Sequence, residues 1–511
     1  MWRVSIPSLL KKALSKRLLV IVVALLVFGS SFFVWRLLGK EFLPPEDRSM
    51  FMVIFQSPVG SSIDYTDAKL KYNEGVLSST PEIKGFFGAI GLGESASVNS
   101  GMMFVRMHPK DERERSQSEV LGELRGRLNA EPGMSAFPMA MAAGFGSHRG
   151  QPLEFIVKGP SLEALDKYSS EIVDRLKEVP GIVGIDTDFD LGLPEIKINI
   201  DRERASDLGV DITTLASTIN LLIGGRDSSD YKEGGKRYDV RMKLDRTQRM
   251  TPSDIEKLSV RNSDGELVRL ASIIDVVEGV SPNVINRNDR ERSITISASL
   301  DGGKTLGSAI EDVKAIAKEV LPDGYTTKLG GSAEQFGETQ MSMLFAFLMA
   351  ILITYMVLAS LFESFAHPFT VMLALPLSIV GALTALLLTG NTINIYSLIG
   401  ITLLVGLVTK NSIILVDYTN RLRNHGDRAI DAVLTAGPVR LRPILMTAFS
   451  TIFGVLPTAV GIGPGSESRA PMAIATIGGL LVATLLTLFV IPVVYTLVDD
   501  LKSKVFKSGK G

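Results

Sequence analysis

The chain has 511 residues, a formal net charge of −1, 46% hydrophobic residues and 21% charged residues. Its mean hydropathy of +0.25 excludes an ordinary soluble enzyme, and its charged fraction excludes a protein that lies entirely within a membrane. The absence of cysteine excludes disulfide bonds. The composition therefore predicts a membrane protein with a large polar domain.

Apolar runs of about 20 residues predict membrane-spanning helices. The sequence holds six such runs, at residues 18–38, 341–361, 368–389, 393–418, 444–462 and 472–498. Basic residues precede the first run, fill the loop after the fourth and follow the sixth. The positive-inside rule therefore puts both termini in the cytoplasm and the long polar block after the first run on the other side. The first run is too long for a signal peptide, so we expect it to remain as an anchor.

The polar block alternates signals for strands and helices in two rounds. The first round is expected at residues 50–57, 64–77, 84–90, 102–108 and 117–128. The second is expected at residues 153–158, 162–176, 184–188, 195–200, 293–298 and 306–320. Repeated βαβ-type units of this size favour split ferredoxin-like subdomains. The predicted fold class is a membrane α-helical protein with six transmembrane helices and an α+β extracytoplasmic domain.

Three further segments of the block lack this alternation. Residues 210–288 carry Gly-Gly pairs and an NSDG turn, which predict a small β-rich subdomain. Residues 91–101 and 134–151 are rich in glycine, serine and alanine, and we expect them to be flexible loops.

Lys410 is a lone cation in the fourth apolar run, where every other residue before Asp417 is uncharged. An ammonium at that depth costs several kcal/mol unless it is paired or hydrated, so it indicates a functional pathway. The alternative is a lysine that snorkels to the interface, but about two helical turns separate it from the cytoplasmic end. Asn411 adds a polar group beside it. Asp417, seven residues on and nearly on the same helix face, is either an interfacial acid or a functional one.

A lysine that takes part in proton-coupled work needs a carboxylate whose charge it balances in one protonation state only. No predicted span offers a mid-membrane Asp or Glu, so the chain holds one half of a charge relay. In the fifth run, Thr447 by itself predicts a hydroxyl bonded to its own helix. Arg440 by itself predicts a determinant of membrane topology.

Signals for other chemistry are weak. The sequence has no nucleophile motif, P-loop or dinucleotide fingerprint, and its four histidines show no ligand spacing, so we expect neither an enzyme nor a resident metal or cofactor. Several methionines near the two loops could bind a soft metal or simply fill gaps in the core. They are Met102, Met103, Met107, Met134, Met139 and Met141.

Several segments closely resemble the C-terminal half of resistance-nodulation-division (RND) efflux permeases of the hydrophobe/amphiphile type. They are FLPPEDRSMFMV (42–53), ERASDLGVDI (203–212), FESFAHPFTVMLALPLSIVGALTALLL (362–388), GLVTKNSIILVDYTN (406–420) and RLRPILMTAFSTIFGVLPTAV (440–460). The resemblance follows the chain in order over nearly its whole length. It implies a proton-driven exporter in the bacterial inner membrane.

The resemblance also implies roles for individual residues. Lys410 matches the relay lysine of the family, Thr447 its relay threonine and Arg440 the arginine at the cytoplasmic proton entry, with Asn411 and Asp417 beside them. In the outer block, Phe87 and Phe104 match aromatic residues of the substrate pocket. Residues 91–101 correspond to the switch loop, where Leu92 and Glu94 replace aromatics of the best-known drug pumps.

The resemblance also implies how the chain is divided into domains and which partners it has. Residues 1–40 form the N-terminal segment and first span, 41–150 the first porter subdomain, 151–210 with 289–332 the second, 211–288 the docking subdomain, and 333–511 the remaining spans. The expected assembly is a trimer with a periplasmic adaptor, an outer-membrane channel, small amphiphilic substrates and membrane lipid, powered by the proton motive force without a cofactor and without nucleic acid.

A whole permease of this kind has two six-helix repeats, and its paired aspartates lie on the other repeat. The resemblance therefore predicts the C-terminal half of a proton-coupled antiporter, which an N-terminal half completes. Two alternatives remain open: a non-transporting relic subunit, and a split subunit that assists protein or lipid export.

Overall fold

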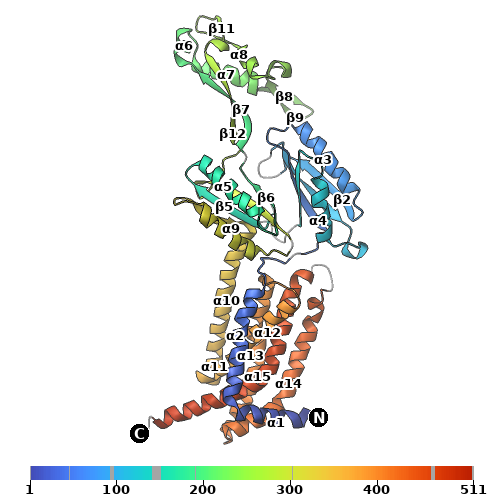
Figure 1. Ribbon diagram of the computed structural model, residues 1–511, viewed down its shortest axis with the longest axis vertical. Helices are drawn as coiled ribbons and strands as arrows, with labels where there is room; N and C mark the ends of the chain where they lie inside the picture. Colours follow the sequence, from blue (N-terminus) through green and yellow to red (C-terminus); the bar gives the residue numbers. More distant parts are fainter. Residues whose placement is uncertain are drawn as a thin grey trace. The chain divides into compact units, whose positions relative to one another are not determined.

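The computed structural model describes residues 2–44, 46–92, 97–140, 151–189, 191–282, 284–301, 303–461 and 466–508. The chain divides into two compact units. One comprises residues 58–61 and 189–285, and the other comprises residues 1–57, 62–188 and 286–511. The larger unit holds the membrane helices and two small α+β subdomains (Figure 1).

Six helical segments of the described chain are long and apolar enough to cross a membrane, as predicted. They are α2 (Arg17–Leu37), α10 (Gly331–Phe362), α11 (Ala366–Met372) with α12 (Ala374–Leu388), α13 (Ile395–Asn424), α14 (Ala429–Ala459) and α15 (Ser466–Ser508). Helix α13 starts at a capping box, in which the Asn394 side chain accepts from the Ser397 amide and the Ser397 hydroxyl bonds back to Asn394.

Two helical features differ from the sequence prediction. Helix α14 begins at Ala429, so Arg440 lies within a helix rather than in a loop. Its first turns bury Ala432, Val433 and Ala436 at helical spacing, but Arg440 and Arg442, which follow them, separate this stretch from the apolar run that predicted the span. Helix α1 (Trp2–Ser15) was not predicted, because its apolar stripe is too short for a hydropathy window.

Close packing within the helix bundle depends on glycine. A Cβ atom on Gly381 of α12 would lie 2.4 Å from the carbonyl oxygen of Gly478 of α15. A Cβ atom on Gly400 of α13 would lie 2.6 Å from the carbonyl oxygen of Met472 of α15. Helix α15 therefore packs directly on the backbones of α12 and α13, as small residues permit in membrane bundles.

The first subdomain is a four-stranded antiparallel sheet with two helices on one face. Its elements are β1 (Met50–Gln56), α3 (Ile63–Ser78), β2 (Ile83–Ile90), β3 (Ser100–Met107), α4 (Gln117–Leu128) and β4 (Ser135–Ala140). The spatial order β2-β3-β1-β4 is that of a ferredoxin-like βαββαβ unit. Strand β4 occupies part of the segment predicted to be a flexible loop, because Ala136 contributes to the core and Ser135–Ala140 pairs with β1.

The second subdomain repeats this topology. Its elements are β5 (Leu153–Gly159), α5 (Leu162–Lys177), β6 (Ile182–Thr187), β14 (Glu291–Leu300), α9 (Leu306–Val320) and β15 (Thr326–Gly330), with the short β13 (Arg287–Asn288) at its edge. Strand β14 pairs with β6 and β5, and β15 pairs with β5, so the order β6-β14-β5-β15 matches that of the first subdomain. The predicted split ferredoxin-like fold is therefore confirmed.

The smaller unit is inserted between β6 and β14. Strand β7 (Leu191–Ile200), placed in the second round by the sequence, pairs instead with β12 (Ile274–Pro282). The unit also contains α6 (Arg202–Asp207), α7 (Ile212–Ile219), β8 (Arg226–Glu233), β9 (Lys236–Met242), α8 (Pro252–Glu256), β10 (Ser259–Arg261) and β11 (Leu267–Arg269). Its core surrounds Leu215 and Leu270, so helices as well as strands build this insertion.

Candidate functional site

Lys410 lies on the exposed face of α13. The residues at helical spacing along this face are Ile399, Leu403, Gly406 and Lys410, and all four are exposed. The opposite side of α13 is buried against the other helices of the bundle. A Cβ atom on Gly406 would meet nothing within 4 Å, unlike one on Gly400. This face, which we call the Lys410 face, is therefore open to a further partner.

The ammonium of Lys410 makes no hydrogen bond or ion pair with any residue that the structure describes. The next residue, Asn411, is buried and reaches α14. The Thr447 hydroxyl lies 3.0 Å from the carbonyl oxygen of Ile444 and 3.4 Å from Oδ1 of Asn411. A hydroxyl has one proton, so these two oxygens compete for it. The structure thus brings Asn411 and Thr447 together between α13 and α14. Lys410 does not join this contact and lies on the exposed Lys410 face of α13.

Asp417 lies near the C-terminal end of α13, and Arg440 lies in the N-terminal part of α14. No hydrogen bond or ion pair joins these two side chains. The guanidinium of Arg440 stacks over the Tyr418 ring, with Cζ 4.4 Å from the ring centroid. Its Nε is buried without a hydrogen bond to the described atoms. Asp417 forms an ion pair with Arg421 at 3.0 Å. Lys410 and Asp417 are seven positions apart, which corresponds to about 10 Å along the helix axis and is too far for direct pairing.

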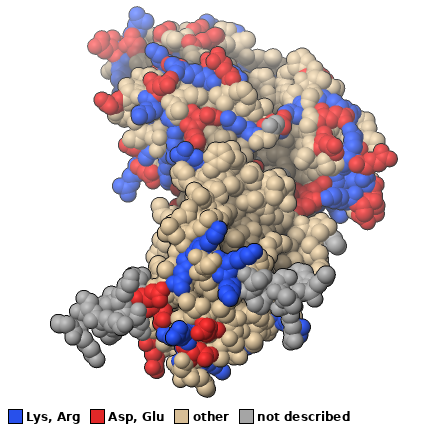
Figure 2. Space-filling model, turned by 60° about the horizontal axis from the view of Figure 1, so that its bottom comes forward, with Lys and Arg blue, Asp and Glu red and all other residues tan. Residues whose placement is uncertain are grey.

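Lys and Arg side chains gather at this end of the bundle, with some Asp and Glu side chains beside them (Figure 2). The exposed cations there include Lys11 and Lys12 of α1, Arg421, Arg428 and Arg442. The surface of the helices themselves is almost free of charge in this view. A basic end next to an apolar belt is what a cytoplasmic membrane surface requires.

A second candidate site is the open face of the first sheet. The strand register aligns one residue from each strand: Phe87 of β2 with Phe104 of β3, Phe104 with Met52 of β1, and Met52 with Met139 of β4. We call these four residues the aromatic–methionine row. The row lies on the face opposite the helices, because the alternate residues of β1 point into the core under α3 and α4. Phe87 is 63% exposed and Phe104 is 37% exposed, whereas Met52 is half-buried and Met139 is buried, so the two aromatic rings are the part of the row that is most open to a ligand.

The sequence pointed to only part of this face. Leu92 follows β2 and is exposed, whereas Glu94 lies outside the described residues. Met52 and Met139 were missed as members of the face. The sequence of β1, MFMVIFQ, could have revealed this face. Both its odd and its even positions are apolar, which indicates a strand with two apolar faces. Among the described residues, no group of three His, Cys, Asp or Glu could hold a metal ion.

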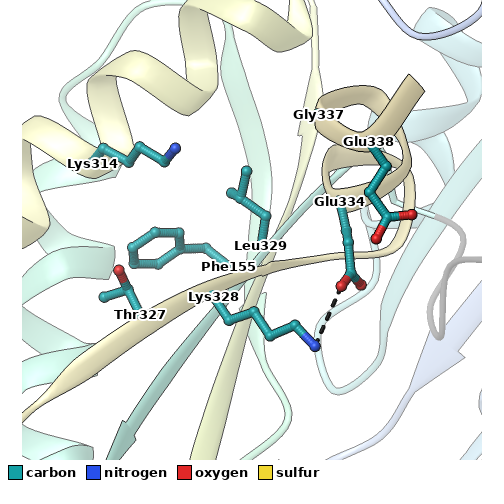
Figure 3. Close-up of a pocket in the computed structure, with 8 residues that line it drawn as sticks. All are labelled: Phe155, Lys314, Thr327, Lys328, Leu329, Glu334, Gly337 and Glu338. Carbon is teal, nitrogen blue, oxygen red and sulfur yellow. Dashed lines mark ion pairs between the residues drawn. The ribbon is translucent and has the colours of Figure 1, made fainter. Parts of the chain in front are cut away.

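A surface pocket of about 380 Å³ lies where the second subdomain meets α10. Figure 3 shows Leu329 and Phe155 between Lys314 on one side and Glu334 on the other. Lys328 and Glu334 form an ion pair across 3.3 Å at its rim. The pocket belongs to the junction of β15 with the membrane helix and does not include the aromatic–methionine row.

The fold and these features define the class of RND efflux permeases, in which spanning helices carry ferredoxin-like subdomains. The model of the AcrB/AcrD/AcrF family matches residues 6–499, and the chain belongs to that family. It is 31% identical over 492 residues to multidrug resistance protein MdtC of Yersinia enterocolitica, covering 96% of this chain and 48% of that protein. It is 31% identical over 506 residues to MdtC of Escherichia coli strain K12 / DH10B, covering 98% of this chain and 49% of that protein.

The fold is also similar to that of a heavy metal efflux pump solved by X-ray crystallography, with a TM-score of 0.85 and 24% identity. That match covers 97% of this chain and 52% of the pump. The chain thus spans about half the length of the curated relatives it matches. Its apolar helices and its family indicate an inner-membrane protein.

Proposed function

We propose that this chain acts as the C-terminal half of a proton-coupled exporter of amphiphilic or hydrophobic compounds. In this proposal, Lys410 and Thr447 supply one side of a proton relay, and an N-terminal half supplies the carboxylates. Proton motive force drives export as antiport, and no cofactor takes part.

The observation that carries the proposal is the unpaired ammonium of Lys410 on an open apolar helix face. A membrane-embedded cation is costly until a counter-charge or water reaches it. The Lys410 face offers room for a partner helix at Gly406, since small residues let helix backbones approach closely. A partner helix bearing a carboxylate would pair with Lys410 in one protonation state and release it in the other, which couples a proton to a change in packing.

The aromatic–methionine row supports the substrate part of the proposal. Aromatic rings and thioethers offer a large, adaptable apolar surface and few directional hydrogen bonds. Such a surface suits ligands that share an apolar body but differ in shape. Both curated relatives are named as multidrug resistance proteins, in keeping with this class of ligand.

We further propose that the assembled pump is a trimer that works with a periplasmic adaptor and an outer-membrane channel. Both ends of the chain would lie in the cytoplasm, in accord with the basic end of the bundle near α1 and the last turns of α13. The two ferredoxin-like subdomains and the inserted unit would then lie in the periplasm.

The test is ethidium accumulation in efflux-deficient cells that express the chain with and without its matching N-terminal half. We expect export only when both halves are present, and a fall to the level of pump-free cells for Lys410→Ala. Lys71→Ala, which removes an exposed lysine of α3, is the matched control and should export normally. Normal export by Lys410→Ala would refute the proposed relay.

A further inference from the structure

The first residue of interest is Glu467, in the first turn of α15. Its Oε2 accepts a hydrogen bond from the backbone amide of Asp47 at 3.1 Å. Its Oε1 forms an ion pair with Lys110, which lies in the short turn between β3 and α4. One carboxylate therefore joins a membrane helix both to the segment that leads into β1 and to a turn of the first subdomain.

The segment around Asp47 is itself firmly held. The Asp47 carboxylate accepts from the backbone amides of Ser49 at 3.1 Å and Gln117 at 3.0 Å. It also pairs with Arg113, whose side chain is only 1% exposed. Arg113 completes its bonding with the carbonyl oxygens of His108 and Arg115. A buried ion pair supported by this many hydrogen bonds is held in one geometry. A displacement of Asp47 would therefore also displace the first subdomain.

The same segment also reaches α13. Residues 39–42 form backbone hydrogen bonds with residues 393–395 at the start of α13, including Glu41 N–H to the Ile393 carbonyl at 2.9 Å and Ile393 N–H to the Gly39 carbonyl at 2.8 Å. Helix α15 packs on α13 through Met472 and Gly400, close to Glu467 along the chain. Two rigid contacts thus connect the helix of Lys410 to the segment that enters β1.

Strand β1 begins at Met50 and carries Met52 of the aromatic–methionine row. A contiguous chain of packed and hydrogen-bonded groups therefore runs from the Lys410 helix to the apolar face. Continuity by itself does not establish coupling, which requires that one contact be shown to control both ends. Of the described contacts along this path, the one between Glu467 and Lys110 is an ion pair between partly exposed side chains and is the easiest to reverse in sign.

We propose that Glu467 is a positioning residue that transmits movement of α15 and α13 to the first subdomain through its contacts with Lys110 and Asp47. The export measurement that tests this inference rests on the proposed function, but the measurement of distances between spin labels does not. It assigns a role to the start of α15 that is separate from the proton relay and from the substrate face.

The experiment reverses the charges of the ion pair. Lys110→Glu and Glu467→Lys are made singly and together in the full chain, expressed with the N-terminal half. The matched control is Arg175→Glu, which breaks an ion pair with Glu319 inside the second subdomain. We expect each single reversal at the Glu467 contact to lower export about tenfold and the control to export normally. The double reversal should restore part of the export, because it re-forms the ion pair, although a lysine at position 467 cannot accept the hydrogen bond from the Asp47 amide.

A second readout does not depend on transport. The chain has no native cysteine, so spin labels can be placed on cysteines substituted for exposed Lys71 of α3 and exposed Arg469 of α15. We expect a narrow distance distribution that broadens in each single reversal and narrows again in the double one.

The outcomes separate the two proposals. Absence of export by the unmodified pair of halves would refute the proposed function, and the label distances would still decide the role of Glu467. Normal export by both single reversals, failure of the double reversal to restore export, or an unchanged distance distribution would each overturn the role proposed for Glu467. Rescue by the double reversal would show that the ion pair itself, rather than either side chain alone, is required for export.

Discussion

The two ferredoxin-like subdomains share one topology but differ on the sheet face that points away from their helices. In the first, strand β1 buries Phe51, Val53 and Phe55 under its helices and presents Met52 and Ile54 on the other side. In the second, strand β5 buries Leu153, Phe155 and Val157. Its other side carries Glu154, which is buried, and Ile156 and Lys158, which are half-buried, next to serine, threonine and lysine on β14 and β15.

This difference separates the sheet face that the fold requires to be apolar from the face whose residues the fold does not constrain. The alternation on the helix-covered face builds the core in both subdomains, because a sheet must bury one face. The open face is not needed for the fold, so an apolar open face requires another explanation. For the first subdomain we propose ligand contact at the aromatic–methionine row as that explanation.

The core positions should behave alike in the two subdomains. Phe55→Ala and Phe155→Ala each empty a fully buried ring site, and each should lower the local free energy of unfolding by about 3–5 kcal/mol. Hydrogen exchange of β1 and β5 in the full chain measures both effects. A loss confined to one subdomain would contradict the view that the two cores are equivalent.

The open-face positions should behave differently. Met52→Glu puts a carboxylate in the apolar row and should lower export about tenfold or more. Ile156→Glu puts the same group between Thr295 and Lys328, its cross-strand neighbours, and should leave export within about twofold. Export assays on the assembled pump measure both variants. Equal losses would show that the apolar character of the first face is not what matters.

Within the first face, the two phenylalanines should share the binding of ligand. Phe87 and Phe104 are direct cross-strand partners, so Phe104→Ala removes half of an aromatic pair and should weaken substrate binding about threefold to tenfold. Fluorescence titration of ethidium into the purified pump measures the change. Phe453→Ala, on the exposed side of α14, is the control and should bind normally. Unchanged binding by Phe104→Ala would remove this residue from the site.

The smallest expected effect is a difference in acid sensitivity. In the first subdomain, hydrogen bonds and ion pairs lower the pKa of Glu82 through Arg115, of Glu119 through Ser116 and of Glu123 through Arg115. Burial opposes ionisation of Asp47, but hydrogen bonds from Arg113 and from the Gln117 and Ser49 amides outweigh it and lower its pKa as well.

In the second subdomain, among the described carboxyl groups, a lowered pKa is found at Glu163, through a backbone amide and Ser161. A carboxyl group with a depressed folded-state pKa stabilises the fold above its unfolded pKa, and this stability is lost as pH falls through the folded value. The first subdomain should therefore lose more stability than the second as pH falls below about 4. Hydrogen exchange as a function of pH measures this difference, and equal losses would refute it.

Much of the membrane part could be predicted from the sequence. A span needs a continuous apolar run, and each run is local in the sequence, so all six were found. The prediction failed at Ala429–Arg442, where basic residues interrupt a helix that continues beyond the apolar core. Helix α1 was missed for another reason: its apolar stripe is short, and Leu10 and Leu14 are buried where α14 and α15 pack against it.

The sequence by itself determined the spans, the two alternating rounds and the isolation of Lys410, because hydropathy, strand alternation and an unmatched charge are all properties of neighbouring residues. Tertiary structure decided which distant groups meet. The pairing of Asn411 with Thr447, the alignment of Met52 and Met139 with Phe104, and the contact of Glu467 with Asp47 each join segments far apart along the chain. Strand register and helix packing set these contacts, and no local pattern encodes them.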